Sequence, residues 1–288
     1  MLKRIGAFGY FIITLIASVG GVLGIFLLFV PKLNKQGWVG VLFLGLLALL
    51  FLGYNWYLYL TYSKKARYAE IFEDINLGFS EIHKTRRNES NSKEILRSLE
   101  NLCEYISSSF EKIYGYKVRT CVKILVSDKD ERPRVATLER DKRSKASGAT
   151  TGIRDNVYHW IDENSDFEFI YNNIGDNYSS LSYHGTRLPI RKKYKNTRLK
   201  EENWPPKKRG FIIDYIKRKR EWPLPYRSTL VVPITPLSGD EQSQSSLRGY
   251  LCVDSPKNLT FNKEYDVDIL RGICDGIYDK IDKLFTQI

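Results

Sequence analysis

Histidine and cysteine, the side chains on which many metal sites and nucleophilic enzymes depend, are scarce in this chain. Its 288 residues include three histidines and four cysteines. The cysteines show no C-x-x-C spacing and each lies in an apolar stretch, as small core residues do in a reducing compartment; they are Cys103, Cys121, Cys252 and Cys274. The pattern argues against a zinc module and against a disulfide framework, and we expect no metal site.

Enzyme signatures are also missing. The sequence has no glycine loop that would cradle phosphates, no G-x-S-x-G, no H-E-x-x-H and no paired-carboxylate constellation typical of a catalytic site. Asp254 follows a strand-like run, but a single acid in that position is more often a turn cap than a catalyst. We therefore expect no catalytic residues, no cofactor and no enzyme activity.

Charged residues are absent from two stretches of 26 residues, Ile5–Val30 and Gly37–Tyr62. A helix of that length is about 39 Å long, which exceeds the ~30 Å hydrocarbon core of a bilayer. A signal peptide has a shorter apolar run and is not followed so soon by a second one. The sequence therefore predicts a transmembrane helical hairpin over residues 1–62.

The basic residues at the ends of the hairpin predict its orientation. Five lie on the terminal side of the two runs, against Lys32 and Lys35 in the connector. The cytoplasmic segments of membrane proteins are enriched in basic residues. We therefore expect an inner- or cytoplasmic-membrane protein with both termini and the following domain in the cytoplasm. Ala17, Gly20 and Gly24 are small residues at a spacing that lets membrane helices pack closely.

A short linker helix is expected over residues 63–90. Its apolar residues recur at spacings of four and three, as in a coiled-coil seam: Tyr68, Phe72, Ile75, Phe79 and Ile82. Two heptads allow a short parallel coiled coil between two copies, and the same seam is equally suited to packing on the following domain. A coiled coil, together with packing between the membrane spans, would make the protein a homo-oligomer.

Residues 91–288 alternate between helical and strand-like patterns. A helix runs from Ile95 to Gly115, a strand follows over 118–127, and a partner strand lies at 135–138. Residues 153–164 have a helical period, 226–234 and 248–256 read as buried strands, and 262–285 form a closing helix. This order predicts an α+β domain with one mostly antiparallel sheet.

Residues 226–285 resemble GAF domains, and the order of elements over residues 92–225 resembles them in topology. The matching residues are the runs STLVVPI, Ser228–Ile234, and GYLCVD, Gly249–Asp254, followed by Phe261 before the closing helix. The resemblance implies a sensory module with a central antiparallel sheet, a layer formed by its first and last helices, and a ligand pocket on the opposite face. The cyclic-nucleotide signature of the family is absent, no cysteine is placed for a bilin, and His159 and His184 are not favoured as haem ligands.

A basic segment, Arg187–Glu221, carries most of the net charge of +12, with fourteen Lys or Arg against four acids. It fits a solvated surface, attraction to an anionic leaflet, or an anionic ligand such as a nucleotide, whose phosphates would pair with arginines and whose base would stack on an aromatic ring. The candidate ligand-binding residues are Arg187, Arg191, Tyr194, Arg198, Trp204 and Arg209.

These observations favour a membrane-anchored sensor that faces the cytoplasm and binds a small anionic ligand through its GAF-like domain. One alternative is a membrane-disrupting effector of bacterial anti-phage signalling, gated by a nucleotide messenger. A second is a membrane-tethered scaffold without a ligand. Long nucleic acid is disfavoured as a partner because tethering at a bilayer limits access to it.

Overall fold

The computed structural model describes residues 20, 21, 24, 37–87, 92–127, 132–146, 159–174, 181–191, 193–199, 216, 219–236 and 244–287. The chain divides into two compact units, residues 1–72 and 73–288. Helix α2, Gly37–Arg87, is continuous across this division in sequence. The second charge-free run and the predicted linker helix are thus parts of one helix.

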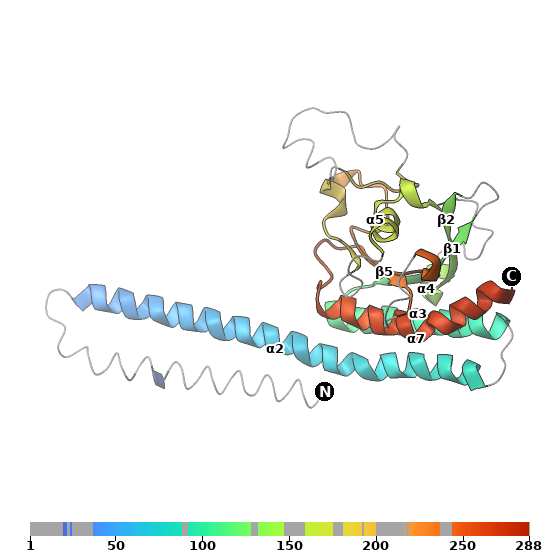
Figure 1. The fold of residues 1–288 in the computed structure, drawn as a ribbon. Helices are drawn as coiled ribbons and strands as arrows, with labels where there is room; N and C mark the ends of the chain where they lie inside the picture. Colours follow the sequence, from blue (N-terminus) through green and yellow to red (C-terminus); the bar gives the residue numbers. More distant parts are fainter. Residues whose placement is uncertain are drawn as a thin grey trace. The chain divides into compact units, whose positions relative to one another are not determined.

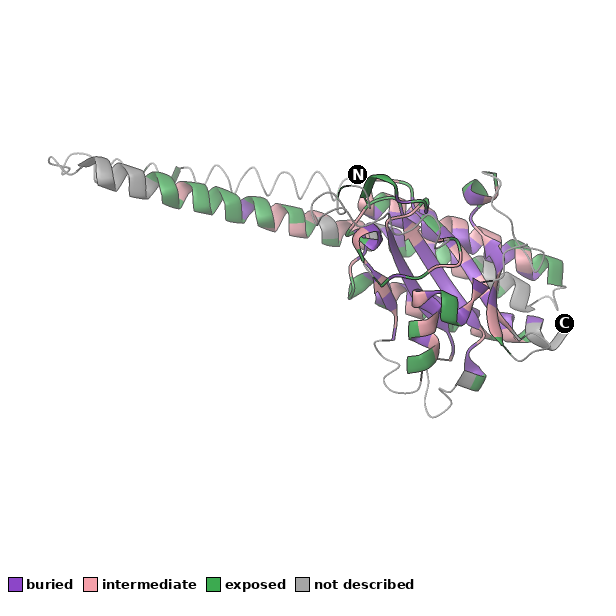
Figure 2. Cartoon of the chain, turned by 90° about the horizontal axis from the view of Figure 1, so that it is seen from above, coloured by how far each residue is buried: buried purple, intermediate pink, exposed green. Residues whose placement is uncertain are grey.

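The described part of the first unit consists mainly of α2. Large apolar side chains of this helix are exposed, among them Leu49 at 68% and Leu50 at 62% (Figure 2). Within the described ranges, no helix is long and apolar enough to cross a membrane. The structure therefore gives the predicted transmembrane hairpin no support. Most of Ile5–Val30, including Ala17, lies outside the described residues, and no described atom lies within 4 Å of a Cβ built on Gly20 or Gly24.

The second unit is built around a six-stranded sheet of order β3-β2-β1-β6-β5-β4. All neighbouring strands are antiparallel, which confirms the predicted α+β class with one antiparallel sheet. The strands are β1 Arg119–Ser127, β2 Pro133–Arg140, β3 His159–Trp160, β4 Tyr183–Gly185, β5 Ser228–Ile234 and β6 Gly249–Ser255. The central strands β1 and β6 connect the two halves of the sheet.

Two long helices, α3 (Ser92–Tyr114) and α7 (Tyr265–Gln287), lie side by side on one face of the sheet (Figure 1). The buried residues of α3 recur at helical spacing, so one apolar face meets the sheet. Helix α3 ends at Tyr114 and is followed by Gly115, whose φ of 77° is left-handed and whose N–H donates to Glu111 O at 2.7 Å. The short helix α4, Lys142–Ala146, lies beside α3, and α5, Ser165–Asn173, covers the opposite face.

Gly249 begins β6 where two backbones approach closely. A Cβ at this position would lie 2.0 Å from Lys123 O, a distance that only glycine avoids without moving a strand. Both faces of β5 are covered, and all its residues are buried, as the short apolar run predicts. Helix α7 covers one of these faces, and a cluster of buried apolar side chains that includes Val231 lies on the other.

The C-terminal part of α2 packs within the second unit. A Cβ on Gly276 of α7 would lie 2.3 Å from the ring of Phe79, and one on Gly78 would lie 2.8 Å from Leu102 of α3. Lys112 Nζ, also on α3, donates to the Asp74 carboxylate at 2.6 Å and forms an ion pair with it. These contacts favour the second of the two alternatives for the seam, packing on the domain, while dimer formation stays a prediction.

The segment between β2 and β4 differs from the sequence prediction. Where the helix expected over 153–164 falls on described residues, the chain forms β3 and a short 3-10 helix, Ile161–Glu163. The regular helix is α5, and it begins at Ser165. Asn164 lies between the two in an extended conformation. Its side-chain amide donates to Trp160 O and to Thr197 Oγ1.

Candidate functional site

A cavity of about 80 Å³ opens on the face of the sheet opposite α3 and α7. Five of the six strands, all except β4, and helix α5 contribute residues to its walls, and Tyr183 of β4 belongs to the core beneath it. Its lining is polar and charged: Cys121, Lys123, Arg140, His159, Asp166, Phe167, Asn196, Arg198, Tyr226, Thr229, Cys252 and Asp254. The position agrees with the pocket that the resemblance implied.

Alternation along β1 divides its side chains between the two faces. Val122 and Ile124 are buried on the helical side, and Thr120 there accepts a 2.8 Å hydrogen bond from Ser107 of α3. Cys121 and Lys123 point to the other face and line the cavity. This period of two follows from strand geometry, and it brings the charged Lys123 to the cavity from the middle of the strand.

Two acids stand in the cavity wall. Asp166 is buried near the start of α5, and burial raises its pKa to about 7. Asp254 lies near the end of β6, where burial raises its pKa to about 6 although Thr229 Oγ1 donates a 2.6 Å hydrogen bond to it. Each is therefore poised to change protonation near neutral pH.

Three cationic side chains, Lys123, Arg140 and Arg198, line the same cavity. Lys123 Nζ donates to Thr137 at 2.9 Å and lies 5.8 Å from the centre of the Phe167 ring. The Nε atom of Arg140 is buried and has no hydrogen-bond partner within the part of the chain that is described. A buried guanidinium nitrogen without a partner is costly, and a bound anion would satisfy it.

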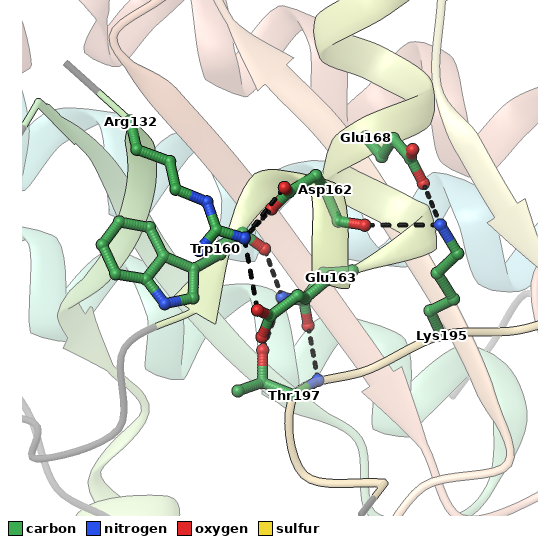
Figure 3. A network of polar contacts seen from close by, with 8 residues as sticks. Arg132, Trp160, Asp162, Glu163, Glu168, Lys195 and Thr197 are labelled. Carbon is green, nitrogen blue, oxygen red and sulfur yellow. Dashed lines mark hydrogen bonds and ion pairs between the residues drawn. The ribbon is translucent and has the colours of Figure 1, made fainter. Parts of the chain in front are cut away.

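Residues 193–199 run beside the cavity and are held by a polar network (Figure 3). The Asn164 side chain donates to Thr197 Oγ1 at 2.7 Å and accepts from the Thr197 N–H at 3.2 Å. Lys195 pairs with Glu168 of α5 at 3.4 Å. These contacts place Asn196 and Arg198, which flank Thr197, at the cavity.

Arg132 extends this network toward solvent. The guanidinium of Arg132 lies 4.4 Å from the centre of the Trp160 ring and donates to both Asp162 and Glu163 (Figure 3). The group is exposed, so these contacts orient the 3-10 helix more than they stabilise the domain.

The structure brings only part of the predicted ligand set to the cavity. Arg198 lines it. Arg191 donates to Tyr183 Oη at 2.8 Å, and Tyr194 is buried in the core beneath, 3.4 Å from Tyr226 Oη. Arg187 is exposed in a left-handed conformation. Trp204 and Arg209 lie outside the described residues.

Most of the cavity wall comes from residues that the sequence analysis treated as fold or left unassigned. Cys121 and Cys252 were interpreted as small core residues, and Asp254 as a turn cap. The one residue that could have indicated the cavity is Lys123, a cation at an inward-facing position of the strand VRTCVKILVS. Asp166 lacked a signal because α5 was not predicted.

Comparison with known proteins yields similarity of fold. No protein-family model and no curated protein matches the chain. The GAF domain of an Acinetobacter phosphoenolpyruvate-protein phosphotransferase is similar at 13% identity and a TM-score of 0.43, covering 75% of this chain and 94% of that one. The chromophore-binding domain of a bacteriophytochrome from R. palustris is similar at 10% identity and 0.42, covering 76% and 64%.

A far-red cyanobacteriochrome photoreceptor is similar at 15% identity and a TM-score of 0.36, covering 76% of this chain and 98% of that one. At such values no residue's role transfers from these proteins. A GAF domain is thus among the solved structures to which the chain is similar.

Proposed function

We propose that this chain is a membrane-attached sensory protein whose GAF-like domain binds a small anionic ligand in the cavity beside α5. The observation that carries the proposal is the buried Arg140 Nε, which has no hydrogen-bond partner among the described residues and belongs to a side chain that lines the cavity together with Lys123 and Arg198. Guanidinium groups pair with carboxylates and phosphates through two parallel hydrogen bonds, which makes such anions the natural occupants.

The two acids in the cavity wall restrict the chemical class of the ligand further. Asp166 and Asp254 would accept hydrogen bonds from hydroxyl or amino groups of a ligand whose anionic end meets the cations. The cavity, at about 80 Å³, is well below the roughly 300–1,000 Å³ of typical drug-sized sites. A carboxylate- or phosphate-sized group fits inside the cavity. The remainder of a nucleotide would extend out of it.

Membrane attachment is supported by the sequence of the first unit. Two stretches of 26 residues lack charge, and in the described part of the second one leucine side chains such as Leu49 and Leu50 are exposed. The distribution of basic residues at the ends of these stretches favours a cytoplasmic domain. Fractionation of cells that produce the full chain tests this, since an integral protein stays in the membrane pellet after alkaline carbonate extraction and release would contradict it.

The route from ligand to membrane runs through α2. Its C-terminal part contacts α3 and α7, and α3 packs on β1, which lines the cavity from its other face. A ligand that shifts β1 would change the surface on which α2 rests. The protein acts in this proposal as a non-enzymatic homo-oligomer.

Ligand binding is tested on the full chain in detergent with a panel of inorganic phosphate, small carboxylates, hydroxy- and amino acids, and nucleotides. The proposal predicts that at least one small anion raises the thermal midpoint and that uncharged analogues do not. A panel without any saturable shift, in protein shown to be folded, would contradict it.

A further inference from the structure

Two cysteines face each other at the centre of the sheet. Cys121 on β1 and Cys252 on β6 are direct partners in the antiparallel register, and both line the cavity. The N–H of Leu125 donates to Arg248 O at 3.0 Å, and since hydrogen-bonded pairs alternate along the ladder, the cysteines also form one. The Cα atoms of such a pair lie about 5.5 Å apart, within the roughly 4.4–6.8 Å that a disulfide spans. Their Cβ atoms also lie about 5.5 Å apart, so a bridge would draw the two strands together by about 1 Å.

The two thiols have unequal surroundings. A hydrogen bond from the Cys252 thiol lowers the pKa of Cys121, against the effect of burial, and nearby Lys123 lowers it further. Burial raises the pKa of Cys252 well above its ordinary value. Cys121 is also the more accessible thiol, since it is half-buried while Cys252 is buried. Cys121 is thus suited to attack and Cys252 to react second.

We propose that Cys121 and Cys252 are a reactive dithiol site that two-electron oxidants of the hydroperoxide class convert to a disulfide. The Cys121 thiolate attacks one peroxide oxygen, the O–O bond breaks, and the other oxygen leaves as hydroxide or alkoxide, which takes up a proton. The Cys252 sulfur then attacks the resulting sulfenic acid, the S–O bond breaks, and water leaves with the thiol proton. Each peroxide is reduced by two electrons and the two thiols are oxidised by two.

The cavity supplies the access that this chemistry needs. Its volume of about 80 Å³ admits a molecule as small as hydrogen peroxide. A bridge here would join the two central strands in the floor of the cavity, between the positions of Lys123 and Asp254. The site therefore reports oxidant directly to the proposed ligand pocket, yet it does not depend on a ligand being bound.

The other two cysteines are built-in controls. Cys103 of α3 and Cys274 of α7 are buried on the helical face of the sheet, outside the cavity lining, and Cys274 Sγ lies 4.0 Å from Val232 O of β5. Burial raises the pKa of both thiols. In the native state we expect Cys121 to be alkylated at least about tenfold faster than Cys103.

The test is cysteine mapping by mass spectrometry of the reduced full chain, before and after hydrogen peroxide and then alkylation under denaturing conditions. The proposal predicts a linked peptide pair containing Cys121 and Cys252, with Cys103 and Cys274 still alkylated. In Cys252→Ser, dimedone should label Cys121, because the sulfenic acid has no second thiol.

Two results would overturn the proposal. One is complete alkylation of all four cysteines after peroxide has oxidised a free-thiol standard, and the other is a link that involves Cys103 or Cys274. The wild-type mapping needs no variant, so a misfolded Cys252→Ser protein does not leave the question open. Loss of anion binding without loss of this disulfide would separate the dithiol site from the proposed ligand function.

Discussion

Thr229 and Asp254 lie directly opposite each other on β5 and β6, and Thr229 Oγ1 donates a 2.6 Å hydrogen bond to the Asp254 carboxylate. Both line the cavity. The bond lowers the pKa of Asp254 while burial raises it to about 6. The hydroxyl therefore keeps a buried acid ionised at neutral pH, where its charge is available to a ligand.

Thr229→Val removes this hydroxyl with little change of shape. The pKa of Asp254 should rise further, and a hydrogen bond to a charged group is worth about 1.5–3 kcal/mol. The stability loss should be larger at pH 8, where the carboxylate is ionised, than at pH 5. Thermal unfolding at both values measures it, with Thr229→Ser as the control that keeps the hydroxyl. An equal loss at the two pH values would contradict the role of the bond.

The acids also predict the pH dependence of stability. The pKa of Asp166 is about 7 in the folded state, against an ordinary value near 3.9. A raised folded pKa contributes stability that is fully present below the unfolded value and is lost as pH rises through the folded one. Stability should thus fall between about pH 4 and 7, by up to about 4 kcal/mol for Asp166.

Asp166→Asn isolates this contribution, because the amide has similar shape and no charge to desolvate. Its unfolding profile should be flatter than that of the wild type between pH 4 and 7, and its relative stability should be greatest at pH 7. An exposed acid, Asp162, supplies the matched control Asp162→Asn. Parallel profiles for Asp166→Asn and the wild type would show that Asp166 is not the titrating group.

The sequence was informative where the apolar period decides the structure. The closing helix, the β5 and β6 runs and the Gly249 boundary follow from residues whose burial or backbone approach allows few alternatives. The cavity was harder to predict, because it forms where β1, β6, α5 and residues 193–199 meet. Lys123, Asp166 and Asn196 are far apart in sequence, and no local pattern states that their side chains share one wall.

The basic segment illustrates the same limit. Its charge density pointed to anion binding, yet Arg191 and Tyr194 are committed to contacts with Tyr183 and Tyr226. Arg198 reaches the cavity because Asn164 holds its neighbour Thr197. Charge is visible in a sequence, whereas the partners that orient it are set by tertiary contacts.

Helix packing gives a matched pair of glycine substitutions on α7. Gly276→Ala places a methyl group against the Phe79 ring, and such overpacking typically costs about 1–3 kcal/mol. Gly272→Ala meets no described atom within 4 Å and should stabilise the helix by about 0.5–1 kcal/mol. Thermal midpoints compare the two, and limited proteolysis shows whether α2 residues near Phe79 are released. Equal effects would contradict the packing of α2 on α7.

Thr197 is expected to position the ligand site without touching the ligand. Thr197→Ala removes the oxygen that accepts from Asn164, so residues 196 and 198 should lose their fixed place. Anion affinity should fall about threefold to tenfold, by loss of preorganisation, with a thermal midpoint close to that of the wild type. Lys193→Ala, an exposed position of the same segment that removes a positive charge, controls for unspecific electrostatics. A larger effect of Lys193→Ala would contradict this role.

The central claim is that the cations of the cavity bind an anion, and a calorimetric titration of the full chain tests it most directly. The probe is the small anion with the largest thermal shift in the panel, titrated into wild type, Arg140→Gln and Arg143→Gln. Arg143 lies on α4 and pairs with Glu104 and Glu111 away from the cavity, so its variant has the same charge change. We predict at least about tenfold weaker binding for Arg140→Gln, equivalent to about 1.4 kcal/mol, and unchanged binding for Arg143→Gln. Equal affinities for all three proteins would contradict the account.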